Sequence, residues 1–143
     1  MGNLEKGIGA NPYSGSDKKA EENNSEKIER VNRTDSGRIR FDETESFERP
    51  GFNGHIYFGD NEGAGFGALE VRVHDSHPEK TVEVETRMYR VEEGNGTFII
   101  NGTSYDAKPG DVFLIRRHST YSYKAHDGMM KLFEINIPYT EKE

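Results

Sequence analysis

The fold of this chain is decided by the stretch Tyr89-Arg90-Val91-Glu92-Glu93-Gly94-Asn95-Gly96-Thr97-Phe98, followed by Ile100-Asn101-Gly102 and by Lys108-Pro109-Gly110-Asp111-Val112-Phe113-Leu114-Ile115. Asn101-Gly102 predicts a two-residue type I′ hairpin turn, because both residues tolerate a positive φ. Gly94-Asn95-Gly96 predicts a second tight reversal. Pro109 fixes φ at one turn position and Gly110 is free at the next, which predicts a third turn. Consecutive antiparallel hairpins follow from these three turns.

Short strand-like runs continue on both sides of this stretch, and none of the segments has the pattern of a long helix. The fold class is therefore all-β. In residues 81–92 the residues Thr81, Glu83 and Glu85 share one face, so polar side chains are expected to point into a barrel that holds a small ligand. The run 112–115 is apolar throughout and predicts a strand buried on both faces. The predicted strands are residues 38–41, 55–58, 66–74, 81–92, 96–101, 103–108, 111–116, 121–125 and 130–137.

The chain of 143 residues has the length of one domain. Hydrophobic and charged residues each make up 31% of it, and the apolar residues are unevenly distributed. Of the 7 Tyr and 8 Phe residues only Tyr13 lies before residue 37. We therefore predict a disordered polar tail over residues 1–36 and a β-barrel domain over residues 37–143.

The charge and the missing residue types exclude several function classes. The net charge is −7, from 26 acidic and 19 basic residues, so nucleic acid is not expected as a partner. No apolar run approaches the ~20 residues that cross a bilayer, and the first residues lack a signal peptide, which predicts a cytoplasmic protein without a membrane partner. The absence of cysteine removes disulfides, thiolate metal ligands and cysteine nucleophiles.

The ordered landmarks from residue 66 to residue 138 resemble the cupin superfamily. In cupins a strand ending in Y-V-x-x-G-x-G leads to a hairpin and then to x-P-G-D-x-x-x-I-P. The chain of a cupin then closes on an apolar strand before a proline, as Leu132-Phe133-Glu134-Ile135-Asn136-Ile137-Pro138 does here. The resemblance implies a double-stranded β-helix, the jelly-roll barrel of cupins. It also implies a homodimer that exchanges edge strands, for which residues 38–41 are the candidate.

The metal ligands of cupins do not carry over to this chain. The first cupin motif places Arg87 at the usual Glu position, with Thr81 and Glu83 at or near the two His positions. The second motif places Tyr121 at the remaining His position. An Arg in place of a ligand repels a cation, so neither a metal nor another cofactor is expected. His74-Asp75-Ser76-His77 precedes a proline and is interpreted as a solvated loop.

Arg87 is the most informative candidate, because the resemblance places it inside the barrel, where an unpaired charge is costly. Two partners are open: an internal carboxylate such as Glu83 or Glu134, or a ligand carboxylate or phosphate held in a bidentate clamp. Tyr89 and Tyr123 are expected beside it. We thus expect a small-molecule-binding protein for a polar or anionic ligand such as a sugar, a sugar phosphate or a carboxylate.

An enzymatic alternative stays open. Metal-independent cupin epimerases use a His base and a Tyr acid, and His118 with Tyr121 or Tyr123 could supply both as catalytic residues of an isomerase or epimerase. Residues 117–125, 129–132 and 136–138 are also loosely similar to the end of ectoine synthase, a cupin that cyclises a diamino acid. A metal-dependent cupin enzyme is the remaining alternative.

Overall fold

The computed structural model describes residues 35–139. The tail expected over residues 1–36 therefore lies outside the described residues, apart from its last two positions. A short 3-10 helix, η2 (Phe41–Glu43), precedes the first strand. None of the helices among the described residues is long and apolar enough to cross a membrane.

Eight strands account for most of the described chain, as the all-β prediction requires. They are β1 (Glu45–Arg49), β2 (Phe52–Phe58), β3 (Gly67–Val73), β4 (Ser76–Thr81), β5 (Glu85–Ile100), β6 (Thr103–Ala107), β7 (Val112–Ile115) and β8 (Thr120–Pro138). All the pairings between them are antiparallel, in the order β1-β2-β3-β8-β5-β6, with β4 paired to β8 and β7 paired to β5.

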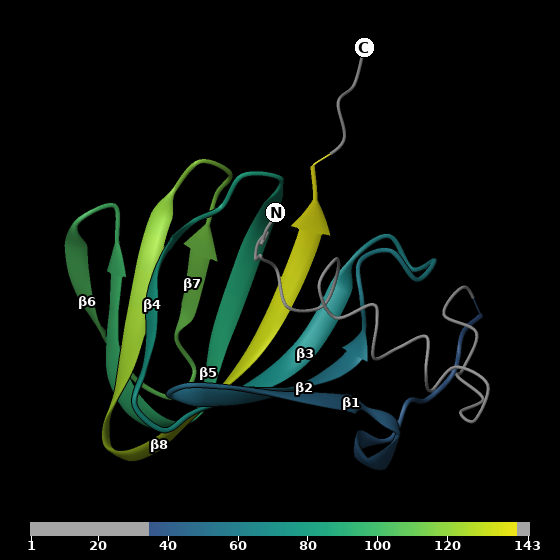
Figure 1. The fold of residues 1–143 in the computed structure, drawn as a ribbon, viewed down its shortest axis with the longest axis horizontal. Coiled ribbons are helices and arrows are strands. Elements are labelled where there is room, and N and C mark those ends of the chain that lie inside the picture. Colours follow the sequence, from purple (N-terminus) through teal and green to yellow (C-terminus); the bar gives the residue numbers. More distant parts are fainter. Residues whose placement is uncertain (1–34, 140–143) are drawn as a thin grey trace.

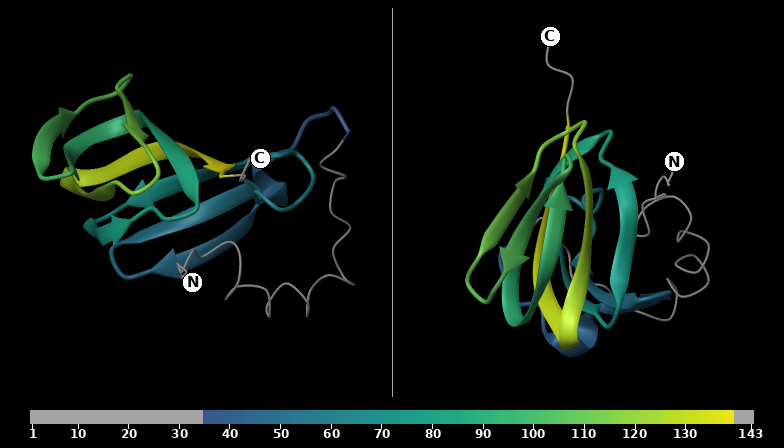
Figure 2. Two further views of the ribbon diagram at one scale, coloured as in Figure 1. Left: turned by 90° about the horizontal axis from the view of Figure 1, so that it is seen from above. Right: turned by 90° about the vertical axis from the view of Figure 1, so that its left-hand side faces the viewer.

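The two long strands, β5 and β8, shape the barrel because each takes part in two groups of strands (Figures 1 and 2). The first half of β5 pairs with β7 and with the second half of β8, which also pairs with β3. The second half of β5 pairs with β6 and with the first half of β8, which also pairs with β4. The interior is thus enclosed between two sheets that share these strands.

Two of the three predicted turns are confirmed. Asn101 and Gly102 have φ values of 49° and 84°, as a type I′ turn between β5 and β6 requires. In the third turn the Asp111 N–H donates to the Lys108 carbonyl at 3.0 Å, and Gly110 has a φ of 97°. The reversal predicted at Gly94 is wrong, because β5 runs through it with register shifts that form a bulge.

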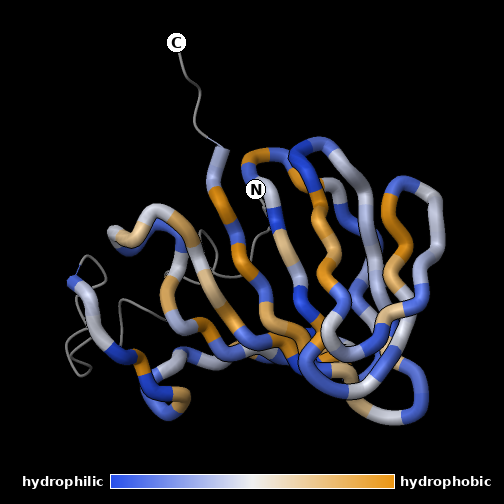
Figure 3. The backbone as a smooth tube through the Cα atoms, turned by 180° about the vertical axis from the view of Figure 1, so that it is seen from behind, coloured by the Kyte–Doolittle hydropathy of each residue, from blue (hydrophilic) through white to orange (hydrophobic). Residues whose placement is uncertain are grey.

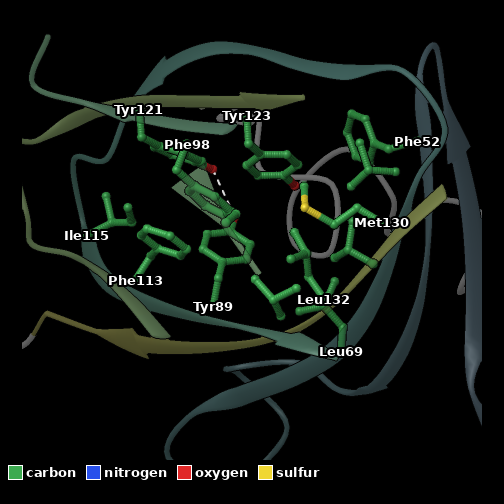
Figure 4. Packing of buried hydrophobic residues seen from close by; sticks show 14 of the residues in the cluster. Phe52, Leu69, Tyr89, Phe98, Phe113, Ile115, Tyr121, Tyr123, Met130 and Leu132 are labelled. Carbon is green, nitrogen blue, oxygen red and sulfur yellow. Dashed lines mark hydrogen bonds between the residues drawn. The ribbon is translucent and has the colours of Figure 1, made fainter. Parts of the chain in front are cut away.

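The core fills the barrel with inward-facing side chains from nearly all strands (Figure 4). Phe98 and Phe113 stack with ring centroids 4.2 Å apart, and Leu69, Met130 and Leu132 are almost completely buried. Along the strands hydrophobic segments lie between hydrophilic loops (Figure 3). Burial of this apolar surface is the main stabilising contribution to the fold.

Several strand predictions need correction. Residues 38–41 do not form a strand; β1, whose residues are mostly polar, is the first strand and lies at one end of the strand order, opposite β6. The run in β7 alternates, with Val112 and Leu114 about half exposed, so it is not buried on both faces. The two strands predicted at 121–125 and 130–137 are halves of β8. Residues 76–81 form β4, which tolerates Pro78 because it pairs on one side, with β8.

Candidate functional site

Polar side chains gather in the barrel where β5 begins and β8 ends. Glu85 and Arg87 of β5 and Glu134 and Asn136 of β8 are all at most 3% exposed. They alternate with more exposed residues, so they share the inner face of the sheet. Arg87 pairs directly with Asn136 across the two strands. These four residues, together with Tyr89 and Tyr121, are called the polar cluster.

Arg87 is the centre of the polar cluster. Its Nε donates to Oε2 of Glu85, and its Nη1 lies 3.5 Å from Oε2 of Glu134. The same Nη1 donates to the hydroxyl of Tyr121 at 2.6 Å and to that of Tyr89 at 3.2 Å. The internal ion pair expected with Glu134 is therefore present.

Glu83, the other carboxylate expected beside Arg87, lies on the surface, with its side chain 67% exposed. The prediction failed because β5 begins only at Glu85, so the alternation of residues 81–85 is interrupted before the barrel. Glu85 takes the expected place of Glu83. Its position on the predicted polar face was the available signal for it.

The tyrosines expected in the interior are all there, and their side chains point into the barrel (Figure 4). The hydroxyl oxygens of Tyr89 and Tyr121 lie 3.1 Å apart. Tyr123 packs its ring on Phe98, with centroids 4.9 Å apart. Burial raises the pKa of Tyr121 to about 12 and those of Tyr89 and Tyr123 well above the usual value. The three phenols are therefore neutral at physiological pH.

Three buried polar atoms of the cluster have no hydrogen-bond partner. They are Oε1 of Glu85 and both Nδ2 and Oδ1 of Asn136. Leaving a buried donor or acceptor unpaired costs about 1–3 kcal/mol, and such groups are uncommon in folded proteins. The alternation of Leu132 and Glu134 already pointed to an inward side chain at residue 136.

The loop between β2 and β3 passes close to this part of the barrel. Asn136 pairs across the strands with Gly67, and a Cβ added at Gly67 would lie 3.1 Å from the backbone nitrogen of Asp60. Burial, together with the negative charge of Glu85, raises the pKa of Asp60, whereas Arg87 opposes this shift. Asp60 therefore adds a third acidic side chain to the electrostatic surroundings of Arg87.

His77 is a site residue that the sequence interpretation missed, because it was assigned to a solvated loop. It lies in β4, and its ring stacks on Tyr121 with centroids 5.3 Å apart and packs against Tyr123 at 4.8 Å. Its Nδ1 donates to the Pro78 carbonyl at 2.7 Å, because a carbonyl can only accept. Burial, assisted by the charge of Arg87, lowers the pKa of His77 to about 3. The imidazole is therefore neutral, with its lone pair on Nε2.

His118, the predicted catalytic base, lies in the loop between β7 and β8 with its side chain 66% exposed. Its Nδ1 is 3.9 Å from a carboxylate oxygen of Glu83, and its backbone N–H donates to the Val82 carbonyl at 2.6 Å. The structure thus brings together two predicted site residues, His118 and Glu83, on the surface. It brings Arg87, Tyr89, Tyr121 and Glu134 together in the interior.

The residues of the described part do not fit the metal centre that the cupin motifs imply. The cupin resemblance places Arg87 at the position of a carboxylate ligand, and a guanidinium cannot bind a cation. Between residues 35 and 139 no group of three or more His, Asp or Glu side chains is arranged to hold a metal ion.

Comparison with known proteins agrees with the barrel architecture. A family model described as an AraC-like ligand binding domain matches residues 66–139, which is nearly the range of the cupin resemblance. A search of curated proteins finds no match.

Three solved structures illustrate the similarity of the fold. KdgF from Halomonas sp. is 15% identical with a TM-score of 0.65, over 75% of this chain and 97% of that one. Pac13, a nucleoside dehydratase of Streptomyces, is 18% identical with a TM-score of 0.63, over 75% of this chain and 86% of that one. The Cnp3 cupin domain of Schizosaccharomyces pombe is 19% identical with a TM-score of 0.56, over 61% of this chain and 64% of that domain, slightly less than two thirds. The TM-scores show that the four proteins share a fold. At identities of 15–19% the similarity concerns the fold alone.

Proposed function

Because the chain belongs to the family of AraC-like ligand-binding domains, we propose that it binds a small polar molecule at the polar cluster of its barrel. The observation that carries this proposal is the set of three unpaired buried atoms on Glu85 and Asn136. A ligand that hydrogen-bonds to these atoms would compensate for the cost of their desolvation.

The charges around Arg87 favour a ligand without negative charge. Arg87 is paired with Glu85 and Glu134, and Asp60 adds a further acidic group nearby. An anion would meet more acidic than basic groups in a region of low dielectric constant, where repulsion is strong. Among the ligands expected from the sequence, a neutral sugar therefore fits better than a sugar phosphate or a carboxylate.

The structures of Pac13 variants with uridine support this choice by analogy of fold. Uridine is an uncharged molecule with several hydroxyl groups. The analogy concerns the fold alone, because the two chains are 18% identical.

An isomerase or epimerase activity through His118 and Tyr121 stays a prediction. Tyr121 is 1% exposed and is held by Arg87 and Tyr89, whereas His118 is on the surface beside Glu83. The contacts of the two residues therefore give no support for a shared acid-base pair, and binding is the function that the site supports best.

The homodimer also stays a proposal, and the strand that is expected to form its interface is a different one from the sequence prediction. Since residues 38–41 are not a strand, the candidate for strand exchange becomes the nearest edge strand, β1 (Glu45–Arg49). A monomeric mass in light scattering would contradict the dimer. The cytoplasmic location stays a prediction.

A thermal-shift screen tests the proposed function. Wild type and the variant Asn136→Val are screened in parallel against neutral sugars, nucleosides, sugar phosphates, carboxylates and amines. We expect at least one neutral or amine compound to raise the melting temperature of the wild type without affecting the variant. The proposal is overturned if no compound stabilises the wild type, or if every stabilising compound acts equally on the variant.

A further inference from the structure

We infer that the ligand of the polar cluster carries a protonated amine next to a hydrogen-bond acceptor, as an amino alcohol or an amino sugar does. The inference rests on the proposed function and deepens it by naming the group that Glu85 and Asn136 recognise. Two independent observations carry it: the pattern of unpaired donors and acceptors, and the excess of acidic side chains.

The unpaired atoms define which hydrogen-bond donors and acceptors the ligand must carry. Oε1 of Glu85 and Oδ1 of Asn136 accept hydrogen bonds, whereas Nδ2 of Asn136 donates. The complementary ligand therefore supplies at least two donors and one acceptor. An ammonium group has three N–H donors and no acceptor, so a single ammonium can serve both oxygens while a neighbouring hydroxyl or carbonyl accepts from Nδ2.

The register places these atoms within reach of one ligand group. Arg87 pairs with Asn136, and Glu85 pairs with Pro138, so Glu85 and Asn136 are diagonal neighbours on the inner face. The Cα atoms of such neighbours are typically about 7–8 Å apart. Both side chains therefore project from the inner face of the sheet on neighbouring strands, where one small ligand group would hydrogen-bond to both.

The net charge of the polar cluster favours an ammonium group over a neutral hydrogen-bond donor in the ligand. Glu85 and Glu134 contact the cation Arg87, and Asp60 is near enough for Glu85 and Arg87 to act on its pKa. Lys80, whose charge acts on His77, is a second cation nearby, so the acidic groups outnumber the basic ones by three to two. The other titratable groups that pack on the cluster, His77 and the three tyrosines, are neutral at physiological pH. A bound cation thus reduces the net negative charge of the site, whereas a neutral group leaves it unchanged.

The test uses three small probes of similar size that differ in charge: 2-aminoethanol, ethylene glycol and glycolate. Binding is followed by NMR through the side-chain amide signal of Asn136, which is identified by its loss in Asn136→Val. We expect a saturable shift with 2-aminoethanol, and affinities at least about tenfold weaker for the other two probes, because one unit charge is at stake in a buried site.

Two matched variants separate the buried charge from a general charge effect. Glu85→Gln removes one negative charge inside the cluster, and Glu83→Gln removes one on the surface two residues away. Glu85→Gln should abolish the preference for 2-aminoethanol, whereas Glu83→Gln should keep it. If Glu85→Gln does not fold, Asp60→Asn in the partly exposed loop replaces it, with a weakening of amine binding of several-fold as the expected result.

Each outcome decides between the two proposals. Equal or tighter binding of ethylene glycol or glycolate overturns the amine inference and leaves a polar ligand site in place. Retention of the full amine preference in the Glu85→Gln variant, or an unchanged affinity for 2-aminoethanol in the Asp60→Asn variant that replaces it, also overturns the amine inference. No saturable shift with any probe, together with a negative thermal-shift screen, overturns the proposed function as well.

Discussion

Asn136 of β8 lies directly opposite Arg87 of β5, yet the two buried side chains are satisfied very differently. Arg87 contacts Glu85, Glu134, Tyr89 and Tyr121, whereas both terminal atoms of Asn136 lack a hydrogen-bond partner. The polar cluster is thus rigidly organised around the guanidinium and incomplete beside it. Such a combination is expected of a site in which a ligand supplies the missing contacts.

Removal of the buried cation tests whether Arg87 organises the cluster. Arg87→Met leaves Glu85 and Glu134 buried without their cation, so we expect a loss of about 3–5 kcal/mol in the free energy of unfolding. Arg72→Met is the matched control, because Arg72 also pairs with the glutamate two residues before it, Glu70, but is 35% exposed. The control should lose no more than about 1 kcal/mol. Equal losses in urea denaturation would contradict the organising role of Arg87.

The lowered pKa of the half-buried His77 predicts an acid-sensitive stability. The pKa of His77 is lowered to about 3 from 6.5, so the unfolded chain binds a proton in this pH window and the folded protein does not. Stability should therefore fall with the pH from 6.5 to about 3, by at most about 1.4 kcal/mol per pH unit from this group. The raised pKa of Asp60 acts in the opposite direction, because the folded state then binds the proton more readily.

His77→Phe keeps the aromatic packing on Tyr121 and Tyr123 but cannot bind a proton. Its unfolding free energy should depend less steeply on pH than that of the wild type across the same window. Urea unfolding at several pH values measures both slopes. Parallel slopes in the two proteins would show that His77 titrates normally and is not desolvated.

Two glycines with positive φ differ in their surroundings: Gly94 lies against the backbone of β8, whereas Gly102 lies in an open turn. Gly94 has a φ of 78°, and an added Cβ would lie 2.2 Å from the Met129 carbonyl oxygen. Gly102 has a φ of 84° with open space around it. We expect Gly102→Ala to cost about 1–2 kcal/mol, the penalty of the left-handed conformation, and Gly94→Ala to cost clearly more. Equal melting temperatures of the two variants would argue against the close contact of β5 with β8.

The surface position of His118 predicts that it does not contribute to binding. His118→Asn keeps a residue that tolerates the φ of 76° and removes the imidazole. We expect the unfolding free energy to change by less than about 0.5 kcal/mol and the ligand affinity to stay the same. Loss of affinity in a titration would place His118 in the site. Loss of turnover at unchanged affinity would instead establish the acid-base role that the cupin resemblance suggests.

The sequence was sufficient to predict the barrel, because the residues that form a turn and the motifs of a family can both be recognised in short segments. Asn101-Gly102 and the turn at Pro109 form as predicted, and the family match covers residues 66–139. Strand β4 was missed because its polar residues and proline do not resemble a buried strand; its role as an edge depends on long-range pairing with β8.

The sequence predicted only part of the candidate site. Arg87 and Glu134 were expected inside because alternation and resemblance place them on the inner face. The exchange of Glu83 for Glu85 depends on where β5 begins, and the place of His77 beside the site depends on its contacts with Tyr121 and Tyr123. The unpaired state of Asn136 is a property of all its neighbours together, so a residue pattern cannot reveal it.

The central claim, that the barrel keeps buried polar atoms unpaired for a ligand, is tested most directly by the unfolding free energy of Asn136→Val without ligand. Removal of an unsatisfied buried amide should stabilise the protein by about 1–3 kcal/mol. Asn53→Val is the matched control, because the amide oxygen of Asn53 is 2.8 Å from Nε2 of His74, and this variant should gain no stability. A higher denaturation midpoint of Asn136→Val than of the wild type is the predicted result. A lower midpoint would show that the amide of Asn136 is satisfied in the free protein, and would contradict the account.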